Sequence, residues 1–338
     1  MQALVGALKA AGEPTRLRIL ALLAHHELTV SELVAILGQS QPRVSRHLRV
    51  LGDAGLVHRH AEGTSALFRL ERSGELGRLV RAILDTVEAD DPDVRRDRGR
   101  LEEIRADRRR QSEDYFRRHA AEWDLISDHH PADAAIERAL VDLVTGLGRI
   151  DLLDLGTGTG RVLELTGPQI RRGLGIDRSR DMLAIARDRL ERRSLHNCEV
   201  RLGDIAALDL PDGVVDVVVL HHVVHFLDDP DRALAEAARV LRPGGTLAIV
   251  DFVPHSRTEL AAAHAHRRLG VSTAEIVSWA EPAGFGTTRE VVFPSHGGPD
   301  ADELAVALWI ARLTPPEPEH APAQRRTDPR RAALEVAS

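Results

Sequence analysis

The chain has 338 residues, a length that exceeds one small hydrophobic core and indicates two domains with a linker. Hydrophobic residues make up 43% and charged residues 29%, the proportions of an ordinary soluble protein, and no apolar run is long enough to span a membrane. The N-terminus lacks the pattern of a signal peptide, and the single cysteine, Cys198, excludes an internal disulfide. These features predict a cytoplasmic protein without a membrane partner.

The first part of the chain predicts short helices separated by turns. Residues 13–24 and 29–37 carry apolar side chains at helical spacing, and Thr29 or Ser31 can cap the second helix. A turn then leads to a third helix that begins at Ser40. The formal net charge of −7 does not exclude a nucleic-acid partner, because the first 85 residues hold more basic than acidic side chains.

The third helix is apolar on one side, where Val44, Leu48 and Leu51 align, and polar on the other. Residues 55–70 follow as two short strands about a polar turn, which predicts a β-hairpin. The set predicts a winged helix-turn-helix, whose second helix reads base edges in the major groove through glutamine and arginine side chains. A unit that only contacts proteins is the alternative. The side chains expected to contact DNA are Ser40, Gln41, Arg43, Ser45, Arg46, Arg49 and Arg59.

The middle of the chain predicts a connection to a second, larger domain. Residues 73–87 predict an amphipathic helix suited to a dimer interface. Residues 88–111 predict a charged linker, with a helical form held by i,i+4 ion pairs as one alternative, and it includes a solvated helix face at 108–110. Strands and helices then alternate, which predicts a parallel sheet covered on both faces. The expected domains are 1–87 (winged helix-turn-helix), 88–111 (linker), 112–313 (α/β domain) and 314–338 (disordered tail). The expected strands follow a first one near 151 at 173–177, 198–203, 215–220, 246–252, 288–293 and 304–312, with helices at 112–128 and 131–146 before them.

Two segments, EPTRLRILALL and ELTVSELVAILGQSQPRVSRHLRVLGDAGLV, resemble the ArsR/SmtB family of bacterial repressors, together with the hairpin, across about residues 5–85. The resemblance implies a homodimer on a palindromic operator in double-stranded DNA, released when an inducer binds. Many members sense a metal through a Cys-Val-Cys sequence, but this chain has Thr29 and Ser31 at those places, and hydroxyls are poor ligands for soft metals. We therefore expect the inducer to bind elsewhere.

Four motifs in order mark the second domain: DLGTGTG at 154–160, GID at 175–177, GDI at 203–205 and LRPGG at 241–245. A glycine-rich turn allows a ligand to approach the backbone closely, and alone it fits a dinucleotide as well. The four together resemble class I methyltransferases over about residues 112–312. The resemblance implies a Rossmann-like, seven-stranded α/β fold and a ligand that is S-adenosylmethionine or S-adenosylhomocysteine.

The chemistry of that ligand suggests a role for several side chains. Its cationic sulfonium and amino group favour Asp154, and Asp177 is placed to accept hydrogen bonds from both ribose hydroxyls. Asp204 is placed to accept a hydrogen bond from the adenine amino group, and Met182 is placed to pack on the adenine ring. A helix-capping role for the last two aspartates is the alternative. The full set expected at the adenosyl site is Asp154, Gly156, Thr157, Gly158, Gly160, Asp177, Arg178, Met182, Gly203, Asp204, Ile205, Leu220 and His221.

Several histidines gather in the second domain: His221, His222, His225, His255, His264 and His266. We interpret them as the wall of a pocket near the transferred methyl group and expect no metal, with metal binding as the alternative. Arsenite methylation would need several thiolates, which Cys198 alone cannot supply. No general base stands out, so the catalytic residues stay unassigned, although methyl transfer often needs only proximity and alignment.

Two functions compete at this stage. In the favoured one, a transcriptional regulator senses the adenosyl ligand and controls methionine-cycle or neighbouring genes. The segment DFVPHSRTELAAAHAHRRLGVSTAEIVSWAEPAGF, which resembles a subgroup of ArsR–methyltransferase fusions, implies such control through S-adenosylhomocysteine. In the alternative, the second domain is an active methyltransferase for an unidentified small-molecule acceptor.

Overall fold

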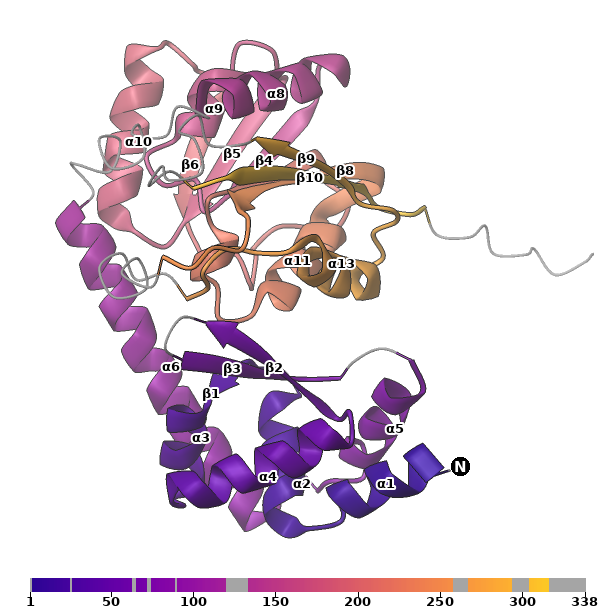
Figure 1. The fold of residues 1–338 in the computed structure, drawn as a ribbon. Coiled ribbons are helices and arrows are strands. Elements are labelled where there is room, and N and C mark those ends of the chain that lie inside the picture. Colours follow the sequence, from indigo (N-terminus) through magenta and orange to yellow (C-terminus); the bar gives the residue numbers. More distant parts are fainter. Residues whose placement is uncertain are drawn as a thin grey trace, which may run out of the picture.

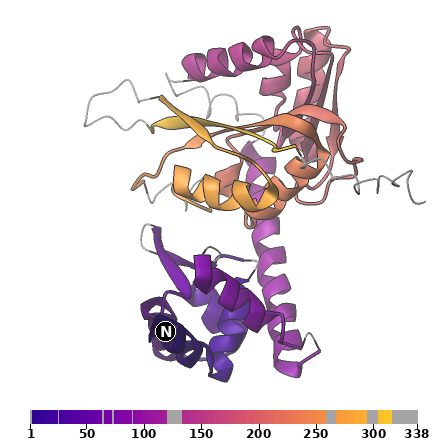
Figure 2. The same ribbon diagram turned by 90° about the vertical axis from the view of Figure 1, so that its right-hand side faces the viewer.

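The computed structural model describes residues 2–24, 26–62, 65–71, 74–88, 90–119, 133–257, 267–293 and 304–315. The chain folds into an N-terminal helical unit with a small sheet and a larger α/β unit, connected by the long helix α6 (Pro92–His119) (Figure 1). A view turned by 90° shows α6 running beside the N-terminal unit and on to the α/β unit (Figure 2).

The N-terminal unit is built around one apolar core to which every one of its helices contributes. Helix α3 begins at a capping box in which Thr29 and Glu32 bond each other's backbone, and it ends at Gly38 with a φ of 65°. These local signals confirm the second predicted helix and its cap. The elements are α1 (Gln2–Ala11), α2 (Pro14–Leu23), β1 (Leu28–Thr29), α3 (Val30–Leu37), α4 (Gln41–Asp53), β2 (Val57–Glu62), β3 (Ser65–Leu70) and α5 (Gly74–Leu84).

Helix α4 and the hairpin that follows it match their predictions. Val44, Leu48 and Leu51 are buried, and Ser40 occupies the N-cap position without a capping hydrogen bond from its side chain. Strands β2 and β3 pair antiparallel, and β1 adds to the outer edge of β3. The polar side of α4 is therefore held away from the core by packing of its other side.

The charged segment before the α/β unit is helical, as one form of the expected linker is, but its side chains are more buried than a solvated linker's. It forms part of α6, and Asp97 on this helix is only 2% exposed. The guanidinium of Arg18 donates two hydrogen bonds of 2.6 Å to that carboxylate, and Leu101 packs into the N-terminal core. The expectation of a solvated face at 108–110 is wrong for Arg108, which pairs with acidic residues of both units. Charge composition alone does not reveal such partners.

The α/β unit confirms the predicted fold class. Its seven strands lie in the order β6-β5-β4-β7-β8-β10-β9, parallel except for β10, which runs antiparallel to both neighbours. Helices α8, α9 and α10 cover one face and α11 and α13 the other, each over its own apolar cluster (Figure 1). The elements are α8 (Asp133–Gly146), β4 (Asp151–Leu155), α9 (Arg161–Thr166), β5 (Arg172–Asp177), α10 (Arg180–Arg192), β6 (Cys198–Leu202), β7 (Val215–His221), η2 (Val224–Phe226), α11 (Pro230–Val240), β8 (Leu241–Phe252), α13 (Thr273–Ala280), η3 (Glu281–Ala283), β9 (Arg289–Phe293) and β10 (Val306–Arg312).

Some expectations fall outside the described residues: the second half of the helix expected at 112–128, the positions of His264 and His266, and the tail from residue 316. Over the described part of the chain, every helix is too short or too polar to cross a membrane.

Candidate adenosyl-binding and DNA-contacting sites

The glycine-rich turn lies between the end of β4 and the start of α9. Gly156, Gly158 and Gly160 have φ values of +73°, +52° and +82°, a left-handed conformation that glycine adopts without a steric penalty. A Cβ on Gly156 would lie 2.5 Å from Val223, whereas beside Gly158 the nearest atom is 4.0 Å away. The turn is therefore closed toward Val223 and open beside Gly158, where a ligand can approach the backbone.

Asp154 lies directly before this turn and is 1% exposed. Its Oδ2 atom accepts a 2.6 Å hydrogen bond from the Thr157 hydroxyl, while its Oδ1 atom has no hydrogen-bond partner among the described residues. Burial raises the pKa of this carboxyl to about 7, the bond from Thr157 opposes the rise, and the nearby charge of Asp177 adds to it. A buried acceptor without a donor suits a ligand that brings an ammonium group.

Asp177 ends β5 and faces the same turn. Its carboxylate accepts hydrogen bonds from the backbone amides of Gly158 at 2.9 Å and Ser179 at 2.8 Å. Burial raises its pKa, and these backbone bonds oppose the rise. A carboxylate has about four acceptor positions, so acceptor capacity remains for ribose hydroxyls. The capping role and the ligand role are therefore compatible.

The next strand brings the third motif to the same edge of the sheet. Gly203 donates its amide to the carbonyl of Asp177 at 3.0 Å, and the Arg178 guanidinium lies 3.4 Å from the carboxylate of Asp204. Met182 and Ile205 are 2% and 6% exposed. The structure thus places the predicted adenine-side residues together at the carboxyl ends of β5 and β6.

The carboxyl end of β7 lies beside that of β4. Leu220 is fully buried in the core, and burial lowers the pKa of the neighbouring His221 to about 4. His221 is therefore a neutral imidazole at neutral pH. Apart from Met182 on α10, the predicted adenosyl-site residues thus come from the ends of four adjacent parallel strands or from the glycine turn, although Leu220 serves the core.

Sequence reasoning missed the partner of His225. Its Nδ1 atom lies 2.6 Å from Oδ1 of Asp251, and the two residues are 1% and 0% exposed. Burial would raise the pKa of Asp251, but the charge and hydrogen bond of His225 outweigh it and lower the pKa to about 2. The available signal was position, because Asp251 lies near the end of β8, which pairs in parallel with β7.

The predicted DNA-contacting residues lie on one side of α4 and on β2. Gln41, Arg43, Arg46 and Arg49 are exposed, Ser45 is half-buried, and Arg59 is exposed on β2. Their contact with DNA stays a prediction.

An ion-pair cluster connects the two units. Arg268, 1% exposed, donates from Nη2 to the carboxylate of Glu27 at 2.7 Å, and Arg267 donates to the backbone carbonyl of Glu27 at 3.1 Å. The backbone amides of both arginines donate to the carbonyl of His225. Burial would raise the pKa of Glu27, but Arg268 lowers it below its ordinary value.

The same cluster continues through the loop after β7. The Asp229 carboxylate contacts His26 and Arg105, and the Asp228 carboxylate lies 3.0 Å from Arg108 and 3.2 Å from Arg267. Arg108 also contacts Glu32 of α3, and burial lowers the pKa of Arg108 to about 10. The loop that follows β7 is therefore bound to the N-terminal unit and to α6.

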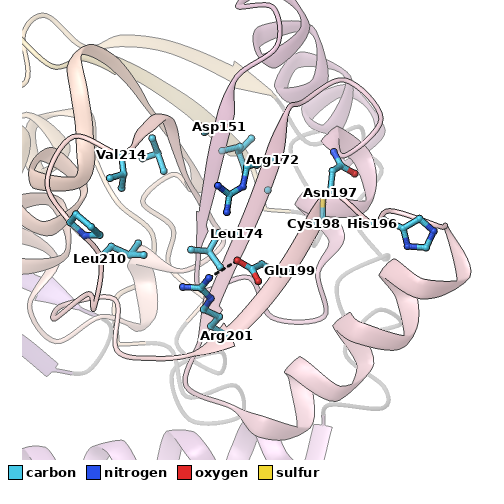
Figure 3. Close-up of a pocket in the computed structure, with 14 residues that line it drawn as sticks. Asp151, Arg172, Leu174, His196, Asn197, Cys198, Glu199, Arg201, Leu210 and Val214 are labelled. Atoms are coloured by element: carbon cyan, nitrogen blue, oxygen red, sulfur yellow. Dashed lines mark hydrogen bonds and ion pairs between the residues drawn. The ribbon is translucent and has the colours of Figure 1, made fainter.

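A cavity of about 460 Å³ lies at the opposite end of the sheet, where β4, β5 and β6 begin (Figure 3). Asp151, Arg172 and Cys198, the first residues of these strands, line it, and Glu199 pairs with Arg201 at 2.6 Å. Burial raises the pKa of Cys198 to about 11, so this thiol stays protonated. The cavity holds none of the predicted adenosyl-site residues.

Comparison with known proteins matches one segment of each unit to a family. Residues 13–59 match the sequence profile of bacterial regulatory proteins of the arsR family, and residues 153–249 match that of the methyltransferase domain. The chain joins an arsR-family helix-turn-helix to a methyltransferase domain. The methyltransferase domain indicates a cofactor of the S-adenosylmethionine type. The unpartnered oxygen of Asp154 and the open space beside Gly158 fit such a ligand.

Individual relatives match parts of the chain. The "uncharacterized 37.1 kDa protein in transposon TN4556" of Streptomyces fradiae is 46% identical over 98 residues, 28% of each protein. An arsenite methyltransferase of Aquipseudomonas alcaligenes is 39% identical over 151 residues, which cover 39% of this chain and 42% of the relative. The chain thus matches less than half the length of either relative.

Among solved structures, the N-methyltransferase NodS of Bradyrhizobium japonicum, in complex with S-adenosyl-L-homocysteine, has a TM-score of 0.46 and 18% identity. The matched region covers 56% of this chain and 90% of NodS.

Proposed function

We propose that this protein is a DNA-binding transcriptional regulator whose methyltransferase domain senses S-adenosylmethionine or S-adenosylhomocysteine. The ion-pair cluster between the two units is the observation that carries the proposal. Glu27 and Glu32, which meet Arg268 and Arg108, belong to the segment that carries the metal-binding cysteines in the ArsR/SmtB proteins it resembles. In this chain the methyltransferase domain contacts the segment where those relatives bind their inducer.

The loop after β7 gives this contact a route from the ligand site. Val223 packs against Gly156 of the glycine turn, and six residues later Asp229 contacts His26 of the N-terminal unit. A ligand can change DNA affinity only if it binds the two states of the protein with different affinity. A loop that contacts both sites supplies a structural basis for that difference.

The DNA-binding part of the proposal is a homodimer on a palindromic operator in double-stranded DNA, located in the cytoplasm. The exposed polar side of α4 provides the base-reading residues. The helix expected at the dimer interface, α5, instead packs Leu76, Leu79 and Val80 into the N-terminal core. Leu4, Val5 and Leu8 on α1 are 41–46% exposed, and such an apolar surface is suited to a second copy of the chain. The regulated genes in this proposal are methionine-cycle or neighbouring genes.

The second candidate function is methyl transfer to a small molecule. The buried His225–Asp251 pair favours it, because a histidine oriented by a carboxylate can accept a proton from an acceptor group. Arsenite is a poor substrate candidate even though one relative carries that name, because Cys198 is the single thiol and is held protonated.

Binding measurements on the full chain separate the two functions. Calorimetric titration with each adenosyl ligand tests the site, and fluorescence anisotropy of operator DNA with and without each ligand tests sensing. The regulator requires that at least one ligand change operator affinity. Ligand binding with an operator affinity that ignores both ligands would rule the sensor out and leave the methyltransferase.

A further inference from the structure

We propose that His222, His225 and Asp251 form a binding site for a divalent transition-metal ion, with Zn²⁺ as the representative ion. Each residue offers one ligand atom, and the three atoms lie within 4.8 Å of one another. Two imidazoles and one carboxylate are a donor set that suits Zn²⁺ and related ions. This site lies next to the predicted adenosyl site, because the rings of His221 and His222 have centroids 4.7 Å apart, and it does not depend on the proposed sensing.

Two adjacent strands position these ligands. His222 follows β7 and has a φ of 54°, an uncommon left-handed conformation for a residue other than glycine. Its backbone amide donates to the carbonyl of Val250 at 2.8 Å, which places it beside the end of β8. The His222 ring centroid then lies 6.4 Å from that of His225. The unusual backbone thus brings a second imidazole toward the His225–Asp251 pair.

Asp251 is oriented by backbone groups. Its Oδ1 atom accepts the amide of Phe252 at 2.8 Å, and its Oδ2 atom accepts the amide of His225 at 3.1 Å. Such outer hydrogen bonds fix the direction of a metal-binding carboxylate. Because Asp251 is fully buried, a divalent ion would also offset the cost of holding its charge away from water.

The arrangement needs only small side-chain movements to hold an ion. Zn²⁺ bonds of about 2.0–2.2 Å in tetrahedral geometry place ligand atoms roughly 3.4 Å apart. His225 and Asp251 lie 2.6 Å apart, closer than this, so the two side chains would separate slightly to admit the ion between them. The ring of His222, which is half-buried, would rotate toward them. Three protein ligands leave one position open for water or an oxygen or nitrogen group of a small molecule.

Metal binding to the untagged full chain tests the site. After chelator treatment, the wild type should bind one Zn²⁺ per chain, and Co²⁺ in its place should give visible absorption bands of nitrogen and oxygen coordination. His222→Ala removes one ligand and should weaken Zn²⁺ binding at least tenfold. His196→Ala removes an exposed histidine beside the distant cavity and should leave Zn²⁺ affinity unchanged.

Asp251→Asn keeps the shape of the side chain and should also weaken Zn²⁺ binding, with folding checked by circular dichroism. If that variant does not fold, the comparison of His222→Ala with His196→Ala decides the question alone. The proposal fails if the wild type binds no stoichiometric ion, or if His222→Ala binds Zn²⁺ as tightly as the wild type. It also fails if His255→Ala, which alters a neighbour of Phe252, abolishes binding while His222→Ala does not.

Discussion

The Nδ1 atom of His26 lies 2.7 Å from Oδ1 of Asp229, and this contact joins the arsR-family unit to the methyltransferase domain. The other oxygen of Asp229 meets Arg105 of α6. Burial would raise the pKa of Asp229, but His26 and Arg105 outweigh it, so the carboxyl stays ionised at neutral pH. One buried carboxylate therefore connects both units and the helix between them.

Asp229→Asn should weaken the response of DNA affinity to the adenosyl ligand. The substitution keeps the shape of the side chain but removes a charge whose hydrogen bonds each contribute roughly 1.5–3 kcal/mol. We expect the ligand-induced change in operator affinity to fall about fivefold or more, with ligand affinity changed much less. Operator titrations with and without S-adenosylhomocysteine measure this. Asp212→Asn, which alters an exposed partner of Arg239 far from the interface, is the matched control. If the ligand changes operator affinity equally in both variants, the interface does not couple ligand binding to DNA binding.

Asp177→Ala should lower affinity for both adenosyl ligands. The change removes the carboxylate proposed to hold two ribose hydroxyls, and the loss of two charge-assisted bonds corresponds to about a hundredfold or more in affinity. Calorimetry measures the loss directly. In the regulator, the operator response should shift to higher ligand concentration by the same factor, while DNA affinity without ligand stays constant. A shift in ligand-free DNA affinity would instead indicate that the variant disturbs the fold, since Asp177 also orders the glycine turn.

Ligand affinity should depend on pH through Asp154. Because burial raises its pKa to about 7, the carboxyl is protonated in the ligand-free protein at lower pH and cannot pair with an ammonium group. Affinity for S-adenosylhomocysteine should therefore rise as pH increases toward 7 and level off above it. The same raised pKa means that the folded, ligand-free protein loses stability as pH rises toward 7, because the folded state binds this proton and the unfolded state releases it.

Titration calorimetry between about pH 5.5 and 8.5 tests the dependence on Asp154. Asp154→Asn cannot ionise, so its weaker binding should be flat across this range. A wild-type affinity that does not change with pH would place the ligand's ammonium group elsewhere.

Patterns along the chain predicted the fold and the grouping of the proposed adenosyl-site residues, because glycine turns and strand ends are local signals. The carboxyl ends of parallel strands meet at one edge, so Asp154, Asp177 and Asp204 could be placed together from the sequence. The interface could not be predicted in this way. Arg108 appears in the sequence as one of three consecutive arginines, and only the tertiary fold brings it to Asp228, 120 residues away in the chain.

The His225–Asp251 pair escaped prediction for a related reason. Asp251 lies in a strand that is apolar on both sides, where a charged residue has no local partner, and His225 is 26 residues earlier. Their contact depends on the parallel pairing of β7 with β8. Side-chain pairs of this kind require the strand order as well as the sequence pattern.

Gln41→Ala combined with Arg46→Ala should abolish sequence-specific DNA binding. Both side chains are exposed on α4, and a good base contact contributes roughly 1–3 kcal/mol of discrimination, so together they should cost at least about thirtyfold in operator affinity. Binding to a scrambled duplex should weaken much less, because contacts to phosphate carry little sequence information. Arg192→Ala, on α10 with a side chain 77% exposed, is a charge-matched control that should leave operator affinity unchanged. Anisotropy measurements on both duplexes at one fixed salt concentration give the comparison. If the double variant binds the operator as the wild type does, α4 is not the recognition helix, because loss of these two side chains leaves the apolar side that holds the helix in place intact.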